Sequence, residues 1–372
     1  MQSISCPACG RDVPAGAFCV RCGNPLRGGS RGFAAAPHQR AGVPSVVPTL
    51  FPHLPRADLA TFRIALGLGL GVVVVLALAR LYPVAVGVSA AIVPVLTWLY
   101  LDDVDIYEEQ PLVVAGVMAV SGGVGGAIAG SLAQWVSTSE EALGSVTLGE
   151  ALWRGVVIPA IAIAIGSVGP LRYLRQHKFN DVLDGVTFGA VAGATLSGTL
   201  VLSSSTDLLS SGLRPVGAVG PWIADLVALS LLLPVVYASA MSGVLAALWL
   251  RLRAPERDRR KLGVLGNPFV AALVALVLVA AASLARIYLG VYMALAVVAL
   301  IALAGIVWLR ITIHLGLTQE ASEIHLGAPI ICPNCGSPTP QHSFCLNCGI
   351  SLLALPKATH SHQIPIIPRS ET

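Results

Sequence analysis

Long apolar runs, separated by short polar segments, dominate the middle of this chain. A helix needs about 20 apolar residues to cross the hydrocarbon core of a bilayer, and eight runs come close to or exceed this length. They cover residues 61–80, 84–101, 112–136, 151–171, 183–204, 221–250, 267–286 and 289–309. The run at 221–250 is long for one crossing and contains Pro234, so it fits either one kinked helix or a broken pair. We predict an all-α polytopic membrane protein with about eight transmembrane helices.

The same pattern divides the chain into six segments. They are a cysteine-rich module at 1–26, a flexible linker at 27–58, the helical membrane domain at 59–310, a linker at 311–330, a second cysteine-rich module at 331–353 and a flexible tail at 354–372. The stretch 24–57 holds Gly, Pro, Ser and scattered Arg without periodicity, which is typical of a tether. Hydrophobic residues make up 55% of the chain and charged residues only 11%, far from the roughly 25% charge of soluble domains.

All eight cysteines belong to two copies of one motif, in which two C-x2-C pairs are separated by nine residues. The copies comprise Cys6, Cys9, Cys19 and Cys22, and Cys332, Cys335, Cys345 and Cys348. Two residues between thiolates let one tight turn present both sulfurs to a metal, and the glycine after each pair gives the turn its backbone freedom. Disulfides and an iron site of rubredoxin type are the alternatives to a zinc site.

A unit of this size cannot bury enough apolar surface to fold alone, whereas structural Zn²⁺ supplies on the order of 10–16 kcal/mol. Both segments resemble the double-knuckle zinc-ribbon family. The resemblance implies two structural Zn²⁺ ions, each with four thiolate ligands and no open position for catalysis.

Two features predict that both termini are cytoplasmic. Thiolate metal ligands belong in a reducing compartment, and residues 1–58 contain no apolar run long enough for a signal peptide. With the N-terminus inside, nine Lys or Arg lie in cytoplasmic loops and four in outer loops, which agrees with the positive-inside rule. The inner residues are Arg172, Arg175, Lys178, Arg251, Arg253, Arg257, Arg259, Arg260 and Lys261, and the outer ones are Arg80, Arg154, Arg214 and Arg286. We expect an integral protein of a prokaryotic plasma membrane.

Ionisable residues inside the bilayer are the usual basis of catalysis or ion coupling, and the apolar runs contain almost none. We therefore assign no catalytic and no further cofactor-binding residues. The acidic run of Asp102, Asp103, Asp105, Glu108 and Glu109 is read as a solvated loop rather than a cation site. Asp181, Asp184 and Asp225 are read as carboxylates that favour helix N-termini, and His360 and His362 as solvated tail residues.

Small residues recur at helix-packing spacing in two runs. They are Gly122, Gly126 and Gly130, and Gly185, Gly189, Gly193 and Ser197. Such stripes allow helix backbones to approach closely in lipid. We read them as packing surfaces, with the lining of a substrate path as the alternative.

The segment FNDVLDGVTFGAVAGATLSG, residues 179–198, contains an Asp-Gly, an aromatic-Gly and a further Gly at Asp184, Gly185, Phe188, Gly189 and Gly193. It is preceded by the acidic segment DVDIYEEQP, residues 103–111. In this signature and this acidic loop, residues 94–250 resemble the PrsW family of intramembrane proteases. The resemblance implies a shared membrane fold.

The groups proposed to be active in that family are a Glu-Glu pair, a Glu-Asn pair and a His. Here the span before the signature reads IPAIAIAIGSVGP without an acid, Leu200 and Val201 occupy the second motif, and Tyr237 stands in place of the His. The resemblance therefore implies a degenerate family member, a pseudoprotease.

Three functions remain open on these patterns. The first is a non-catalytic membrane scaffold or regulatory protein whose cytosolic zinc ribbons bind a partner protein, another copy of the chain or each other. The others are a PrsW-type protease with displaced active residues, and a transporter or channel for a neutral substrate. Nucleic acid is not an expected partner, because residues 332–349 contain no charged side chain to contact phosphates. The first ribbon, with Arg11, Arg21 and the following Arg27, Arg31 and Arg40, has the charge to contact anionic membrane lipids.

Overall fold

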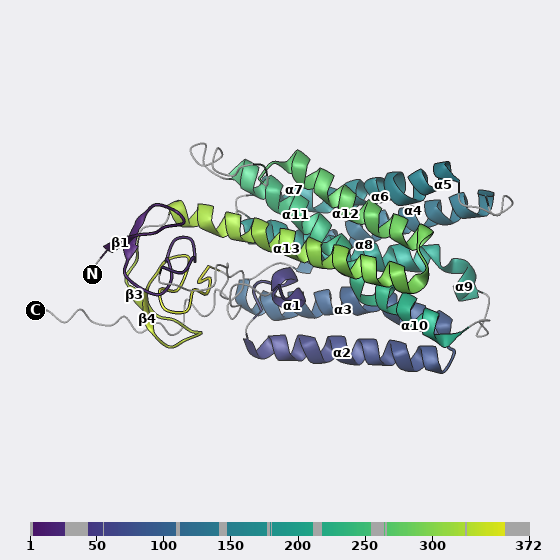
Figure 1. The fold of residues 1–372 in the computed structure, drawn as a ribbon, viewed down its shortest axis with the longest axis horizontal. Coiled ribbons are helices and arrows are strands. Elements are labelled where there is room, and N and C mark those ends of the chain that lie inside the picture. Colours follow the sequence, from purple (N-terminus) through teal and green to yellow (C-terminus); the bar gives the residue numbers. More distant parts are fainter. Residues whose placement is uncertain are drawn as a thin grey trace, which may run out of the picture.

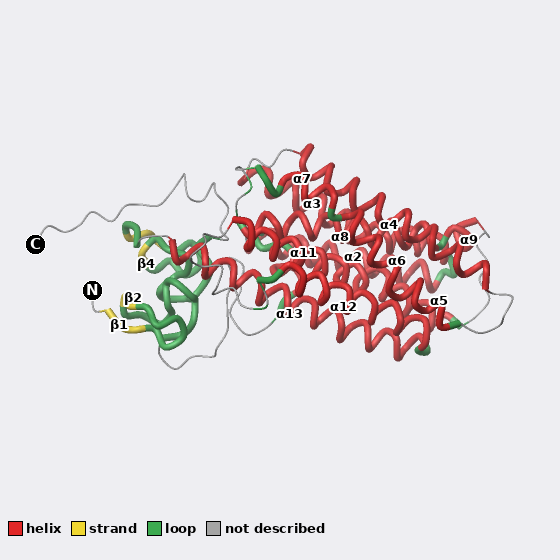
Figure 2. The backbone as a smooth tube through the Cα atoms, turned by 90° about the horizontal axis from the view of Figure 1, so that it is seen from above, coloured by secondary structure: helices red, strands yellow, loops and turns green. Residues whose placement is uncertain are grey.

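The computed structural model places a bundle of long helices beside a small lobe formed by both ends of the chain (Figure 1). It describes residues 3–26, 44–54, 56–108, 112–140, 147–176, 179, 181–210, 218–253, 264, 266–323 and 326–353. The cysteine-rich segments both lie at the same end of the bundle, close to the end of the last helix (Figure 2).

The described residues contain eight helical segments that are long and apolar enough to span a membrane, which confirms the predicted fold class. Single helices form five of them: α2 (Arg56–Leu78), α3 (Tyr82–Glu108), α4 (Leu112–Glu140), α8 (Val182–Ser204) and α12 (Pro268–Tyr288). Composite helices form two more: α5 (Leu148–Leu152), the π-helical turn η2 (Trp153–Val157), α6 (Ile158–Gly166) and α7 (Val168–Tyr173), then α10 (Val219–Val227), η3 (Ala228–Leu232) and α11 (Leu233–Arg253). The last is α13 (Val291–Glu323), and two short helices, α1 (Val46–Leu50) and α9 (Thr206–Ser210), lie outside the spans.

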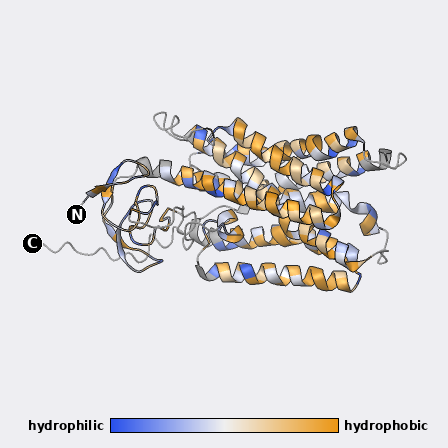
Figure 3. Cartoon of the chain, viewed as in Figure 1, coloured by the Kyte–Doolittle hydropathy of each residue, from blue (hydrophilic) through white to orange (hydrophobic). Residues whose placement is uncertain are grey.

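The outer surface of the bundle is apolar, as expected for contact with lipid (Figure 3). Leu68, Trp135 and Phe269 are among its most exposed side chains. Exposing such a continuous apolar surface to water is unfavourable in free energy, whereas exposing it to the hydrocarbon of a bilayer is not. The helices differ in depth: α2 mostly faces outward, whereas α8 and the α10–α11 helix are mostly buried.

Helix α8 lies at the centre because small residues on one face let α11 approach closely. A Cβ added at Gly189 would overlap the backbone of Ser242, and one added at Gly193 would overlap the backbone of Ala238. The approach also lets the Ser242 hydroxyl donate a hydrogen bond to the Val186 carbonyl at 2.8 Å. The glycine stripe of α8 is therefore a packing surface.

The opposite contact of α8, with α4, pairs glycines with hydroxyl side chains. Gly122, Gly126 and Gly130 each leave no room for a Cβ against α8, and they face, in order, the hydroxyls of Thr195, Thr199 and Ser203. The Ser203 hydroxyl donates to the Gly126 carbonyl at 3.3 Å. This stripe, too, serves helix packing.

The long apolar run at 221–250 forms one continuous helix rather than a broken pair. The π-helical turn Ala228–Leu232 lies immediately before Pro234. A proline lacks an amide donor, and its ring clashes with the carbonyl four residues earlier, here that of Ser230. The wider turn accommodates this clash, so the helix continues to Arg253.

The linker boundaries differ from the prediction at both ends of the bundle. Residues 46–50 of the expected linker 27–58 form α1, and Leu54 behind it is fully buried; residues 27–43 lie outside the described chain. The expected linker 311–330 is helical as far as Glu323, because α13 continues past the membrane span. Leu309, Ile313 and Leu317, four residues apart, are all buried and extend one helical stripe.

Two predictions about carboxylates also change. The acidic run was expected to form a loop, but α3 continues through it to Glu108, and Glu109 lies outside the described residues. Asp225 does not cap a helix: it lies inside α10, and its carboxylate accepts a hydrogen bond from Arg286 at 3.0 Å. At the start of α8 the prediction is confirmed, because Asp181 and Asp184 form a capping box.

Candidate metal centres

Each end of the chain folds into a small ribbon, and the two ribbons repeat one another element by element. In the first, β1 (Ser3–Ser5) pairs antiparallel with β2 (Asp12–Pro14); in the second, β3 (Pro329–Ile331) pairs with β4 (Pro338–Pro340). An isolated bridge follows each hairpin, Phe18 with Pro25 and Phe344 with Ser351. Each element holds the same place relative to the four cysteines of its ribbon.

Every C-x2-C pair is closed by a backbone hydrogen bond that requires the glycine after it. The amides of Gly10, Gly23, Gly336 and Gly349 donate to the carbonyls of Cys6, Cys19, Cys332 and Cys345, at 2.8, 2.9, 2.8 and 3.0 Å respectively. All four glycines have φ between +68° and +70°. This is the left-handed region, which costs other residues roughly 1–2 kcal/mol.

The sulfur positions fit a tetrahedral metal ion. The Sγ atoms of Cys6 and Cys22 are 3.6 Å apart and those of Cys9 and Cys19 are 3.9 Å apart. In the second ribbon the distances from Cys332 to Cys348 and from Cys335 to Cys345 are both 3.8 Å. A tetrahedron with metal–sulfur bonds of about 2.3 Å has edges of about 3.8 Å, whereas a disulfide requires about 2.05 Å. The eight predicted ligands therefore form two four-sulfur sites, and the disulfide alternative does not fit.

Hydrogen bonds between the thiols already favour the thiolate that a metal needs. The pKa of Cys19 is lowered chiefly by a hydrogen bond from Cys22, and the pKa of Cys345 chiefly by one from Cys332. The donor thiols show the opposite shift, so the pKa values of Cys22 and Cys332 are raised. The shifts show that the four sulfurs of each cluster lie close enough to share protons, which a bound cation would displace.

The two ribbons contact each other, which is one of the two kinds of contact expected for them. The Phe344 amide donates to the Val20 carbonyl at 3.0 Å, and the Phe18 amide donates to the Leu346 carbonyl at 2.9 Å. Phe18 and Phe344 occupy equivalent positions in their ribbons, as do Val20 and Leu346. The contact is therefore reciprocal, with an approximate two-fold relation between the ribbons.

Aromatic rings complete this reciprocal contact. The ring of Phe344 lies against Gly23 of the first ribbon, and the ring of Phe18 lies against Gly349 of the second. Both ribbons thus use a phenylalanine before the third cysteine and a glycine after the fourth. That shared pattern is the sequence feature that could have indicated the pairing.

The second ribbon also anchors the pair to the bundle. Phe344 is fully buried, and its ring centroid lies 6.0 Å from that of His314 on α13. Phe344 belongs to the same continuous apolar core as Leu317, and Leu353 packs against that core. The unexpected extension of α13 therefore provides the surface on which the ribbons sit (Figure 2).

The positions that correspond to the active groups of PrsW proteases do not form a polar cluster in this fold. Val201 and Tyr237 are buried and Leu200 is half-buried, and the Tyr237 hydroxyl is hydrogen-bonded to the Ser283 side chain of α12. Asp184 caps its helix end, as described above, and His360 and His362 lie outside the described residues. Comparison of the sequence with protein-family models and curated proteins, and of the fold with solved structures, finds no match.

Proposed function

We propose that this chain is an integral membrane scaffold or regulatory protein whose zinc-loaded termini form one partner-binding module on the cytoplasmic side. The observation that carries the proposal is the reciprocal pairing of the ribbons, which joins both ends of the chain at one end of the bundle. A pairing built into the fold gives the ribbons a shared, fixed geometry, which is what a docking surface requires.

Zinc is the metal that best suits these sites. Four thiolates in tetrahedral geometry leave no open position, which is typical of structural zinc. The small apolar cluster of the first ribbon consists mainly of three of its cysteines with Val13 and Val20. Such a core cannot hold the ribbon without a metal. Four thiolates would also bind iron, so elemental analysis is needed to separate the two.

The cytoplasmic orientation rests on thiolate chemistry and loop charge. An even number of spans brings both ribbons to the same side, in agreement with the end of the bundle where they lie. With the N-terminus inside, the sequence assigns nine Lys and Arg to inner loops and four to outer loops, and cytoplasmic loops are enriched in such residues.

The pairing leaves one part of each ribbon available to a partner. The second C-x2-C pair of each ribbon lies at the mutual contact, whereas the tips of both first pairs are exposed. These tips comprise Pro7 to Gly10 and Pro333 to Gly336. A protein partner that binds both tips at once would recognise the paired arrangement and not an isolated ribbon.

The test combines metal analysis with partner capture in cells. We expect about two zinc ions per purified chain and about one in each double variant, Cys6→Ser with Cys9→Ser or Cys332→Ser with Cys335→Ser. Ala8→Glu, on the exposed tip, should keep both metals but lose the proteins that cross-link to the wild type. Ser3→Glu, exposed but away from the tip, is the matched control.

Two other outcomes would contradict parts of the proposal. Iron in place of zinc would overturn the metal assignment. Two zinc ions with an unchanged set of cross-linked proteins in Ala8→Glu would make the ribbons local folding units, and a transporter or channel for a neutral substrate would become the better proposal.

The kinship with PrsW proteases over residues 94–250 also stays a proposal. Its support is the glycine signature of α8, which here packs against α11. Proteolysis by displaced residues would require polar groups other than those of the family. Purified wild type and a folded Asp184→Asn variant would be compared in their ability to cleave a membrane-spanning test substrate. Cleavage by the wild type that is lost in the variant would favour this alternative over the scaffold.

A further inference from the structure

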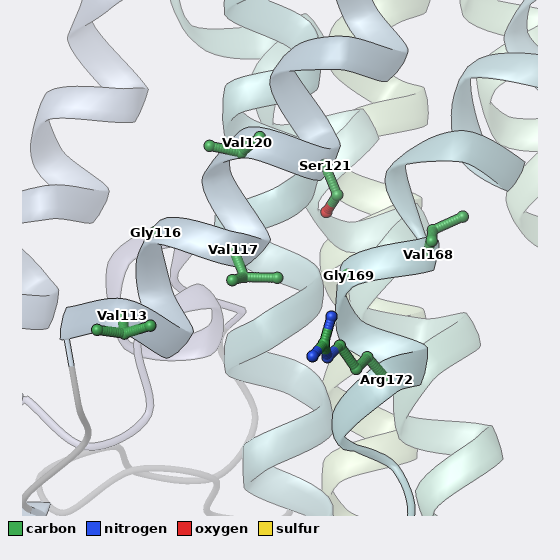
Figure 4. A pocket seen from close by; sticks show the side chains of 8 residues that line it. All are labelled: Val113, Gly116, Val117, Val120, Ser121, Val168, Gly169 and Arg172. Atoms are coloured by element: carbon green, nitrogen blue, oxygen red, sulfur yellow. The ribbon is translucent and has the colours of Figure 1, made fainter.

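A groove opens on the outer surface of the bundle between α4 and α7, at the end where the ribbons lie (Figure 4). Its volume is about 430 Å³, and it is lined by Val113, Gly116, Val117, Val120, Ser121, Val168, Gly169 and Arg172. We infer that this groove binds one acyl chain of an anionic glycerophospholipid, whose headgroup is held by Arg172.

The groove exists because glycines replace larger side chains on both of its walls. On α7, Gly169 lies close against α4, where an added Cβ would overlap the Ser121 side chain and the Val117 carbonyl. On the facing wall Gly116 has no atom within 4 Å of the place where a Cβ would stand. A side chain there would occupy the groove without disturbing the bundle.

The inner wall has no side-chain hydrogen-bond donor left for water. Among the lining residues that the structure describes, Ser121 carries the one hydroxyl, and its proton is already shared between the carbonyls of Met118 and Gly166, at 3.0 and 3.1 Å. The remaining inner wall is valine and glycine. Hydrocarbon is therefore a better occupant than water or a polar solute.

Of the lining residues that the structure describes, Arg172 is the one that carries a charge, and it lies at one end of the groove. Arg172 is the penultimate residue of its membrane span, Leu148–Tyr173, and the picture shows its guanidinium directed from α7 toward α4 (Figure 4). Among the residues that the structure describes, no carboxylate pairs with Arg172. An arginine at this depth reaches the headgroup region, where a phosphate is its natural counter-ion.

The combination selects the lipid class. An acyl chain matches the apolar wall, and a guanidinium favours headgroups with net negative charge over zwitterionic ones by about 1 kcal/mol, or fivefold in affinity. Free phosphate or glycerol phosphate would contact Arg172 alone and gain nothing from the groove.

Native mass spectrometry of the full chain, released from nanodiscs of mixed anionic and zwitterionic lipid, tests this inference. We expect the wild type to retain one anionic lipid preferentially. Arg172→Gln should lower that preference about fivefold, while Arg175→Gln, an exposed arginine outside the groove, should not. Gly116→Leu fills the groove and should abolish retention. Gly87→Leu, on α3 and equally free of contacts at its Cβ, should leave it unchanged.

Melting temperatures of the four variants would show whether each still folds. Excess glycerol phosphate, which has no acyl chain, should not displace the lipid. Equal retention in folded Gly116→Leu and wild type would overturn the inference and leave only unspecific annular lipid. Displacement by glycerol phosphate would show a simple phosphate contact instead and would overturn it equally.

Discussion

Four glycines share one backbone conformation, but only two of them contact the opposite ribbon. Substitutions at these glycines can therefore distinguish the folding of one ribbon from the pairing of both. Gly10, Gly23, Gly336 and Gly349 each follow a C-x2-C pair with φ near +69°. No atom lies within 4 Å of a Cβ added at Gly10 or Gly336, whereas a phenylalanine ring of the opposite ribbon lies against Gly23 and Gly349. An alanine at any of them strains the backbone by about 1–2 kcal/mol, but only two of the four also disturb the pair.

We predict that Gly23→Ala separates the ribbons and that Gly10→Ala does not. The readout is hydrogen exchange at the Phe18 and Phe344 amides, which donate across the contact. Gly23→Ala should lose their protection, while Gly10→Ala should retain it; metal content should stay at the wild-type value in both. Equal loss of protection in the two variants would mean that backbone strain alone, and not the aromatic contact, governs pairing.

Phe344 and Phe18 occupy equivalent positions but should not be equivalent in energy. Phe344 is fully buried between Gly23 and His314, whereas Phe18 is only half-buried. Removing a buried phenylalanine side chain costs about 3–5 kcal/mol. Phe344→Ala should therefore detach both ribbons from α13 and expose them to limited proteolysis. Phe18→Ala should weaken only the pairing, and a similar effect of the two variants would contradict the asymmetric anchoring.

The metal ligands could be predicted from sequence because a C-x2-C pair determines its own geometry within five residues. The pairing of Phe18 with Gly349 could not, since it joins residues at opposite ends of the chain and depends on where the bundle brings them. The same limit applies to Asp225, whose partner Arg286 lies on another helix. Its sequence position near a helix start indicated a cap, whereas the tertiary contact decided its role.

At the scale of the helices, the α4–α8 contact can be tested with two adjacent glycines. A Cβ at Gly122 would overlap the Ala192 carbonyl and the Thr195 hydroxyl, whereas at Gly123 the nearest atom is a Thr199 methyl carbon at 3.6 Å, an ordinary contact. Overpacking of this kind costs about 1–3 kcal/mol. Gly122→Ala should lower the unfolding midpoint of the detergent-solubilised protein, measured by titration with SDS. Gly123→Ala is the control, and equal midpoints would show that the helices can separate at no cost.

Span positions followed from hydrophobicity, because the length of an apolar run sets the length of a spanning helix. Helix ends were less predictable where burial continued beyond the bilayer. The extension of α13 contains His314, Thr318 and Gln319, so its composition suggested a linker. It is helical because its apolar stripe packs under α1 and the second ribbon. Likewise, the π-helical turn before Pro234 relieves a steric clash between the proline ring and the Ser230 carbonyl, and hydropathy does not predict such a turn.

At the scale of the whole molecule, the contact between the two ribbons is too small to be stable without the bundle. It consists of a few backbone hydrogen bonds and two aromatic rings against glycines, far less than the interfaces of stable complexes. The bundle supplies what the contact lacks, because it holds both ends of the chain at one end. Tethering of this kind gives an effective concentration in the millimolar range, so a weak contact can be nearly fully formed.

We therefore expect the pairing of the ribbons to depend on an unbroken chain and not on protein concentration. A protease site inserted between residues 27 and 43 would allow the first ribbon to be cut from the bundle after folding. In the intact chain, protection of the Phe18 and Phe344 amides should be the same at high and low protein concentration. After cleavage it should be lost on dilution, because the effective concentration falls to that of the sample. An uncut chain exposed to the same protease without the inserted site is the control. Protection that depends on concentration in the intact chain would instead place the pairing between two copies, and the ribbons would then be a means of oligomerisation.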